Sequence, residues 1–190
     1  MKSILSIVLL TVLTMLLAPA ARASLIGNVT ISELFPDSVT VFNGGTGAIA
    51  VGGSLSCPAG ASPLCTSGYF VQPATLSITA SNISISEQCC TTYAAAAFNG
   101  YSFTGLTFAD GGSLAGVVLS SSNMAGIAPA DVTFTAHSIF INLQGVAVGA
   151  VTGAPASFTL TVSEAPEPSS LFLLGPALAG LAFLIRRRQA

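Results

Sequence analysis

The sequence SFTLTVS occupies Ser157–Ser163, and its strict alternation decides the fold class. Phe158, Leu160 and Val162 alternate with serine or threonine at every other position. A period of two places successive side chains on opposite faces of an extended chain. The segment therefore predicts a β-strand with one apolar face and one hydroxyl face.

The rest of the central sequence repeats this theme. Residues that favour helices, such as Glu, Lys, Gln and Arg, are rare there, and short β-branched runs recur between glycine or proline clusters. We expect further strands at Val29–Ser32, Val39–Phe42, Ala74–Ser86, Tyr101–Phe108, Val117–Ser120, Asp131–Ala136 and Ser138–Leu143. Strands at this spacing predict an all-β, antiparallel β-sandwich.

Glycine, asparagine and proline indicate where the chain should turn. The apolar phase changes within Ala74–Ser86, which predicts a bulge or tight turn near Ser81-Asn82, and Gly105 should interrupt its strand in the same way. Turn residues also cluster at Asn43–Gly45, Asn99-Gly100, Asp110–Gly112 and Gly153–Pro155.

The first 23 residues have the layout of a secretory signal peptide. Lys2 provides a positive start, Ile4–Leu17 is almost continuously aliphatic, and small residues flank Arg22 at the end. We expect a signal peptidase to cleave between Ala23 and Ser24. The alternative, an uncleaved anchor, is less favoured because the apolar run is short for a membrane span.

The C-terminus carries a second apolar segment. Leu171–Ile185 is apolar throughout and is followed directly by Arg186, Arg187 and Arg188. As a helix, these fifteen residues cover roughly 22 Å, which is less than the ~30 Å hydrocarbon core of a bilayer. A membrane span must therefore extend over about 169–185, or the bilayer must become thinner around it. The arginine cluster should stop transfer and remain cytoplasmic. The sequence thus predicts a transmembrane helix with the globular part outside.

Residues 24–163 are long enough for one domain, and residues 164–190 form the tail. All lysines and arginines belong to the two ends, so the domain carries only acidic formal charges: Glu33, Asp37, Glu87, Asp110 and Asp131. Because no cation could meet a phosphate backbone, we exclude nucleic acid as a partner.

The four cysteines are Cys57, Cys65, Cys89 and Cys90. In an exported chain they predict structural disulfides rather than metal or redox chemistry. A Cys57–Cys65 loop closure is one simple pairing. Since adjacent cysteines bond to each other only through a strained ring, linkage of Cys89 or Cys90 back to the first pair is equally plausible.

We find no catalytic residue, metal-ligand set or cofactor motif. His137 is the single histidine, and nothing identifies a serine that it could activate. Five scattered acids always permit some carboxylate pair, so they do not indicate a glycosidase. Gly44–Gly47 lacks the lysine of a phosphate-binding loop, and we interpret it as a turn.

The most specific motif is Pro166-Glu167-Pro168, followed by the short apolar segment and the terminal arginines. This tail resembles the PEP-CTERM sorting signal of Gram-negative bacteria over about twenty-five residues, with Ala165 where valine is common. The resemblance implies recognition and processing by an exosortase at the inner membrane. It also implies a final location at the cell surface or in an exopolysaccharide-rich extracellular matrix or biofilm.

These observations predict a non-catalytic surface or matrix protein that is sorted through its tail, with exopolysaccharide as a candidate partner. A carbohydrate-binding or adhesion module is the main alternative, and a secreted hydrolase is less favoured. Tryptophan is absent and the only tyrosines are Tyr69, Tyr93 and Tyr101, so an aromatic platform for sugar stacking is poorly supplied.

Overall fold

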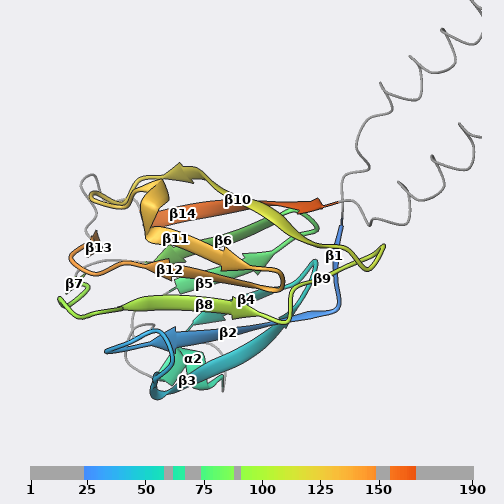
Figure 1. Cartoon of the computed structure of the whole chain (residues 1–190). Helices are drawn as coiled ribbons and strands as arrows, with labels where there is room; N and C mark the ends of the chain where they lie inside the picture. Colours follow the sequence, from blue (N-terminus) through green and yellow to red (C-terminus); the bar gives the residue numbers. More distant parts are fainter. Residues whose placement is uncertain (1–23, 58–61, 67–73, 88–90, 149–154, 166–190) are drawn as a thin grey trace, which may run out of the picture.

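The computed structural model describes residues 24–57, 62–66, 74–87, 91–148 and 155–165, and the regular secondary structure of these residues is almost entirely β-strand (Figure 1). All strand pairs among them are antiparallel. The expected all-β antiparallel class is therefore confirmed.

Two five-stranded sheets make up most of the described chain. The first sheet has the order β10 (Ser113–Ser122), β14 (Ala156–Ala165), β6 (Asn82–Glu87), β5 (Ala74–Ile78) and β4 (Ser54–Cys57). The second has the order β11 (Val132–Thr135), β12 (Ser138–Asn142), β8 (Gly100–Thr104), β2 (Asn28–Leu34) and β3 (Val41–Ala50).

Short elements complete the fold. Two small pairs join β1 (Leu25–Ile26) to β9 (Thr107–Phe108) and β7 (Thr91–Thr92) to β13 (Ala147–Val148). The described residues also contain one helical turn, α2 (Pro63–Thr66), and one 3₁₀ turn, η1 (Pro129–Asp131).

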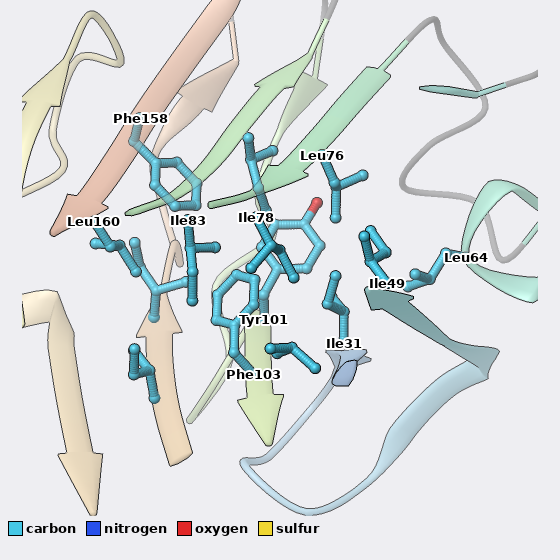
Figure 2. Close-up of a cluster of buried hydrophobic side chains, with 14 of the residues drawn as sticks. Ile31, Ile49, Leu64, Leu76, Ile78, Ile83, Tyr101, Phe103, Phe158 and Leu160 are labelled. Carbon is cyan, nitrogen blue, oxygen red and sulfur yellow. The ribbon is translucent and has the colours of Figure 1, made fainter. Parts of the chain in front are cut away.

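The hydrophobic core lies between the two sheets. Ile31, Tyr101 and Phe103 of the second sheet point towards side chains of the first sheet such as Ile83 and Phe158 (Figure 2). All five are at most 1% exposed. The alternation seen in Ser157–Ser163 is therefore explained: its apolar side chains enter this core, and its hydroxyl side chains do not.

The predicted interruptions near Ser81 and Gly105 are both confirmed. Ala74–Ser86 divides into β5 and β6, and the Thr79 N–H donates to the Asn82 carbonyl across the turn at 2.8 Å. Gly105, with a φ of 74°, separates β8 from β9. At the C-terminal side, β14 continues through Glu164 to Ala165, two residues beyond the expected end of the domain at 163.

The predicted turn at Asn43–Gly45, and with it Gly44–Gly47, is wrong. Both segments lie inside β3, where positive φ at Asn43 and Gly44 accommodates a bulge opposite β2. Gly47 pairs with Ile31, and a Cβ there would lie 2.9 Å from the Leu64 side chain of α2. Glycine is therefore needed here partly because a helix packs closely over the strand.

The turn predicted at Asn99-Gly100 is also wrong. Gly100 begins β8 and pairs with Leu34 on one side and Asn142 on the other. A Cβ at Gly100 would collide with the backbone carbonyl of Ile141. The glycine therefore permits a close approach of two strands rather than a change of direction.

The edges of the two sheets lie against each other. On one side β10 contacts β11, and the Leu114 N–H donates to the Ala136 carbonyl at 2.9 Å. On the other side β3 contacts β4 and is covered by α2. The disulfide between Cys57 and Cys65 fastens α2 to the end of β4.

Both ends of the described domain lie at one end of the sheets (Figure 1). The Ser24 carbonyl accepts a hydrogen bond of 3.0 Å from the Ala109 N–H, and Ala165 is paired with Ser113. The β9–β10 turn, residues 109–112, therefore has the start of the domain on one side and its end on the other.

Candidate functional site

The outer face of the first sheet is lined with hydroxyl groups. Strands β4, β5, β6 and β14 each alternate a core-facing apolar side chain with an outward serine, threonine or asparagine. We call the following residues the hydroxyl face: Ser54, Ser56, Thr75, Ser77, Asn82, Ser84, Ser86, Ser157, Thr159, Thr161 and Ser163. None of them is charged or aromatic.

The strand register arranges the hydroxyl face in rows across the sheet. One row contains Ser54, Ser77, Ser84 and Thr159, which lie opposite one another on successive strands. The Ser84 and Thr159 hydroxyls form a hydrogen bond of 3.0 Å. Neighbouring strands are about 4.8 Å apart, so the groups in a row follow one another at roughly that interval.

Other members of the hydroxyl face are also hydrogen-bonded within the sheet. The Thr161 hydroxyl donates to the Asn82 side-chain carbonyl at 2.8 Å, and the Ser163 hydroxyl donates to the Gly116 carbonyl at 3.2 Å. Each hydroxyl oxygen can still accept a further bond. The surface can thus offer many weak polar contacts to a neutral, hydroxylated partner, but none of the residues of the hydroxyl face is a base that could activate one of its serine or threonine hydroxyls as a nucleophile.

A second group of polar residues is buried in the core. Glu33 on β2 and Tyr101 on β8 lie opposite each other in the second sheet, Glu87 ends β6 in the first sheet, and Tyr93 follows β7. Their exposed fractions are 0%, 0%, 6% and 3% respectively. We call these four residues the carboxyl–tyrosine cluster.

Hydrogen bonds join Glu87, Tyr93 and Tyr101 of this cluster across the two sheets. The Tyr101 hydroxyl donates to Glu87 Oε1 at 2.7 Å, and the Tyr93 hydroxyl lies 2.9 Å from Glu87 Oε1. The two tyrosine oxygens are 2.7 Å apart, and their rings meet edge to face. Glu87, at the end of β6, therefore accepts hydrogen bonds from Tyr101 on β8 and from Tyr93, which follows β7.

Burial dominates the electrostatics of the cluster. Loss of solvent raises the pKa of Glu87 above its ordinary value of 4.5, although the hydrogen bonds from Tyr101 and Tyr93 oppose the shift. Burial, and then the negative charge of Glu87, raise the pKa of both tyrosines well above 10.0. In the folded core, Glu87, Tyr93 and Tyr101 therefore keep their protons to a higher pH than the same side chains do in water.

The structure therefore brings together Glu33 and Glu87, two of the five acids that the sequence left unpaired. They do not form the carboxylate pair of a glycosidase, because that pair must flank a bound sugar and these side chains are at most 6% exposed. The cluster instead connects the two sheets. The sequence contained a signal of this burial. Glu33 lies two residues after Ile31, and Glu87 lies two residues after Ile85, so in a strand each glutamate shares a face with these apolar side chains.

His137 is exposed in the β11–β12 turn. Its Nδ1 atom lies 3.1 Å from the Leu106 carbonyl, and its own backbone carbonyl accepts a bond from the Leu106 N–H. Asp131, the acid closest to His137 in the sequence, accepts a hydrogen bond from the Ala128 N–H at the opposite end of β11. The structure does not bring these two residues together as a catalytic pair.

Of the pairings that the sequence left open, the structure contains Cys57–Cys65. Cys89 and Cys90 lie outside the described residues. The same is true of Tyr69, the predicted signal peptide up to Ala23, the Pro166-Glu167-Pro168 motif, the segment 169–185 and Arg186–Arg188. Ser24 is the first described residue.

If the chain is exported as the sequence predicts, alkylation of the unreduced protein should leave all four cysteines unlabelled, because an oxidising compartment favours disulfides. Mass spectrometry with and without prior reduction measures this directly. After reduction we expect four labels, and Cys57 and Cys65 should occur in one cross-linked peptide before it. Free thiols at Cys57 and Cys65 without reduction would contradict the disulfide.

Within the described part of the chain, no group of three or more His, Cys, Asp or Glu residues could hold a metal ion. Among the same residues, no helix is long and apolar enough to cross a membrane. Comparison with known proteins finds no matching family model, no matching curated protein and no matching solved structure.

Proposed function

We propose that this chain is an exported, non-catalytic protein of the cell surface or extracellular matrix, with a single β-sandwich domain between a cleaved signal peptide and a sorting tail. The observation that supports the domain's role is the hydroxyl face. It extends over four strands, is uncharged, and none of its residues is a histidine, cysteine or acid that could activate its hydroxyls, as expected of a packing or adhesive surface.

The proposed route uses both ends of the sequence. The signal peptide directs export, and the segment 169–185 with its arginine cluster holds the chain in the inner membrane. An exosortase-type enzyme then reads Pro166-Glu167-Pro168 and processes the tail. Two prolines keep the motif extended and stop the membrane helix from continuing outward, which leaves the motif accessible.

The substitution Glu167→Ala tests this route. Glu167 is the only charged residue between Glu164 and the arginines, so a cation in the processing enzyme could recognise it. We expect full-length, membrane-retained protein, while export and folding of the domain remain normal. Replacement of Arg186–Arg188 should instead disturb orientation or retention.

The measurement is the intact mass and membrane fractionation of each variant in a strain that contains the sorting enzyme. Asp131→Asn, a single-charge change on the domain surface, is the matched control and should be processed like the wild type. If Glu167→Ala is processed and released normally, the tail is only an anchor and the sorting proposal fails.

A carbohydrate-binding module is the second candidate, and the rows of the hydroxyl face favour it. Repeated donors and acceptors could bind a neutral polysaccharide through many weak contacts that add by avidity. Against it, the hydroxyl face has no aromatic side chain for sugar stacking. Binding on a glycan array that is lost in Ser84→Lys, on the inner strand β6 of the face, would favour this candidate over a packing role.

A further inference from the structure

The tripeptide Phe-Asn-Gly occurs twice in the chain, at Phe42–Gly44 and at Phe98–Gly100. Among the six asparagines of the sequence, only Asn43 and Asn99 are followed by glycine. Glycine matters at this position because it has no Cβ that would hinder its backbone nitrogen from attacking the side-chain amide of the preceding asparagine. The two segments share this local chemistry, so a large difference in reactivity between them must come from the fold.

The first copy lies in a large bulge of β3, which is an edge strand of the second sheet. The register of β2 with β3 shifts here, so that one residue of β2, Glu33, lies opposite the stretch 42–45 of β3. Asn43 and Gly44 are both exposed, and their φ angles are 45° and 72°. A Cβ built on Gly44 would have no atom within 4 Å apart from its chain neighbours. The dipeptide therefore has open space in which its side chain and backbone can rearrange.

The second copy is enclosed by the core. Asn99 is 0% exposed, and its Nδ2 atom donates a hydrogen bond of 2.9 Å to the Ala94 carbonyl. Its backbone N–H donates to Asn142 Oδ1 at 3.0 Å. The next residue, Gly100, packs so closely against β12 that a Cβ there would collide with the Ile141 carbonyl. Asn99 can therefore rearrange only after this part of the fold has opened.

We infer that Asn43 is a site of spontaneous covalent modification, where the folded protein loses the side-chain amide, whereas burial protects Asn99. The Gly44 nitrogen attacks Asn43 Cγ and forms a bond with it. The Cγ–Nδ2 bond breaks, and ammonia leaves with the proton of the Gly44 N–H. Water then opens the resulting succinimide ring at either carbonyl carbon, which gives aspartate or isoaspartate. Water is the only co-reactant, so the reaction needs no enzyme.

The modification changes both the charge and the backbone of the domain. Residues 24–163 contain five acidic side chains and no lysine or arginine, so each event adds one negative charge to an already acidic domain. Opening of the ring to isoaspartate also inserts a methylene group into the backbone of β3. The charge of the domain therefore records the age of the folded protein. The inference goes beyond the proposed function and depends neither on export nor on processing of the tail.

The unmodified chain contains its own control. Full-length protein, purified in detergent, is incubated at mildly alkaline pH in heavy-oxygen water, either folded or unfolded in guanidinium with its disulfides reduced. Peptide mass mapping gives the rate at each asparagine separately, and the heavy oxygen marks only product that forms during the incubation. Ring formation at Asp110-Gly111, which would release water instead of ammonia, falls in another part of the peptide map and is scored separately.

We expect both asparagines to react at similar rates in the unfolded chain. In the folded chain, Asn43 should react within about tenfold of its unfolded rate, because exposed segments open at almost no cost in free energy. Asn99 should react at least about a thousandfold more slowly than in the unfolded chain, because a typical folded domain is open in roughly one molecule in a thousand or fewer.

Two variants check the site independently. Asn43→Gln keeps an amide but would have to form a larger, less favourable ring, so the charge change at this position should disappear. Asn43→Asp should migrate in isoelectric focusing with the aged wild-type protein. Equal rates at the two asparagines in the folded chain, whether both fast or both slow, would overturn the inference. The C-terminal mass of the same samples reports tail processing, so failure of this site and failure of the sorting proposal give different results.

Discussion

Substitution of Tyr101 by alanine should lower the free energy of unfolding by roughly 3–5 kcal/mol, the usual cost of removing a large buried aromatic side chain. Tyr101 is 0% exposed and packs between the sheets, and its hydroxyl donates to Glu87. Both the packing and this donor are lost. Chemical denaturation of the purified protein, followed by near-UV circular dichroism, measures the change.

Two variants separate these contributions. Tyr101→Phe keeps the ring and removes only the hydroxyl, so it should cost about 1–3 kcal/mol, the typical penalty for depriving a buried acceptor. Phe134→Ala removes an aromatic side chain that is 42% exposed and should cost about 1 kcal/mol or less. If Tyr101→Ala were no more harmful than Phe134→Ala, the proposed core would be incorrect.

Raising the pH should destabilise the domain through Glu87. Burial raises the pKa of Glu87 in the folded state, so the folded chain keeps a proton that the unfolded chain has lost above about 4.5. The associated stability is fully present below that pH and is lost as the pH rises through the folded-state pKa. The raised pKa values of Tyr93 and Tyr101 add a further loss above pH 10.0.

The comparison with Glu87→Gln isolates this effect. Glutamine cannot ionise, but its side-chain carbonyl still accepts a hydrogen bond from the tyrosines. The stability of the wild type relative to Glu87→Gln should therefore fall between about pH 4 and the folded-state pKa, near and above the ordinary value for a glutamate. A constant difference over this range would show that Glu87 is not desolvated in the folded state.

The sequence predicts strands well wherever one face is apolar and the other is polar. Ser157–Ser163 became β14 because burial on one face imposes a period of two. The same reasoning finds only the first two residues of β3, within the expected strand Val39–Phe42, and misses the rest because Gly44, Gly45 and Gly47 have no side chains from which a period could be read. It also treats Gly100 as a turn residue, although the need for glycine there comes from the Ile141 carbonyl of a strand distant in the sequence.

The buried polar cluster was harder to predict. Glu33, Glu87, Tyr93 and Tyr101 are spread over nearly seventy residues, and only the register of two sheets brings them together. A glutamate in phase with apolar neighbours indicates a buried acid, but it does not identify the partner. The Cys57–Cys65 pairing was among the alternatives, since four cysteines allow three pairings and spacing alone does not choose between them.

The protected sheet edges would matter in the extracellular matrix proposed as this protein's location, where many copies would lie close together. Proteins with many like charges repel one another and stay apart, but residues 24–163 contain only five charged side chains. Crowded copies would therefore come close enough for an open strand to pair with a neighbour and start a fibril. Because β10 lies against β11 and α2 covers β3, the fold limits this kind of uncontrolled polymerisation by shape rather than by electrostatic repulsion.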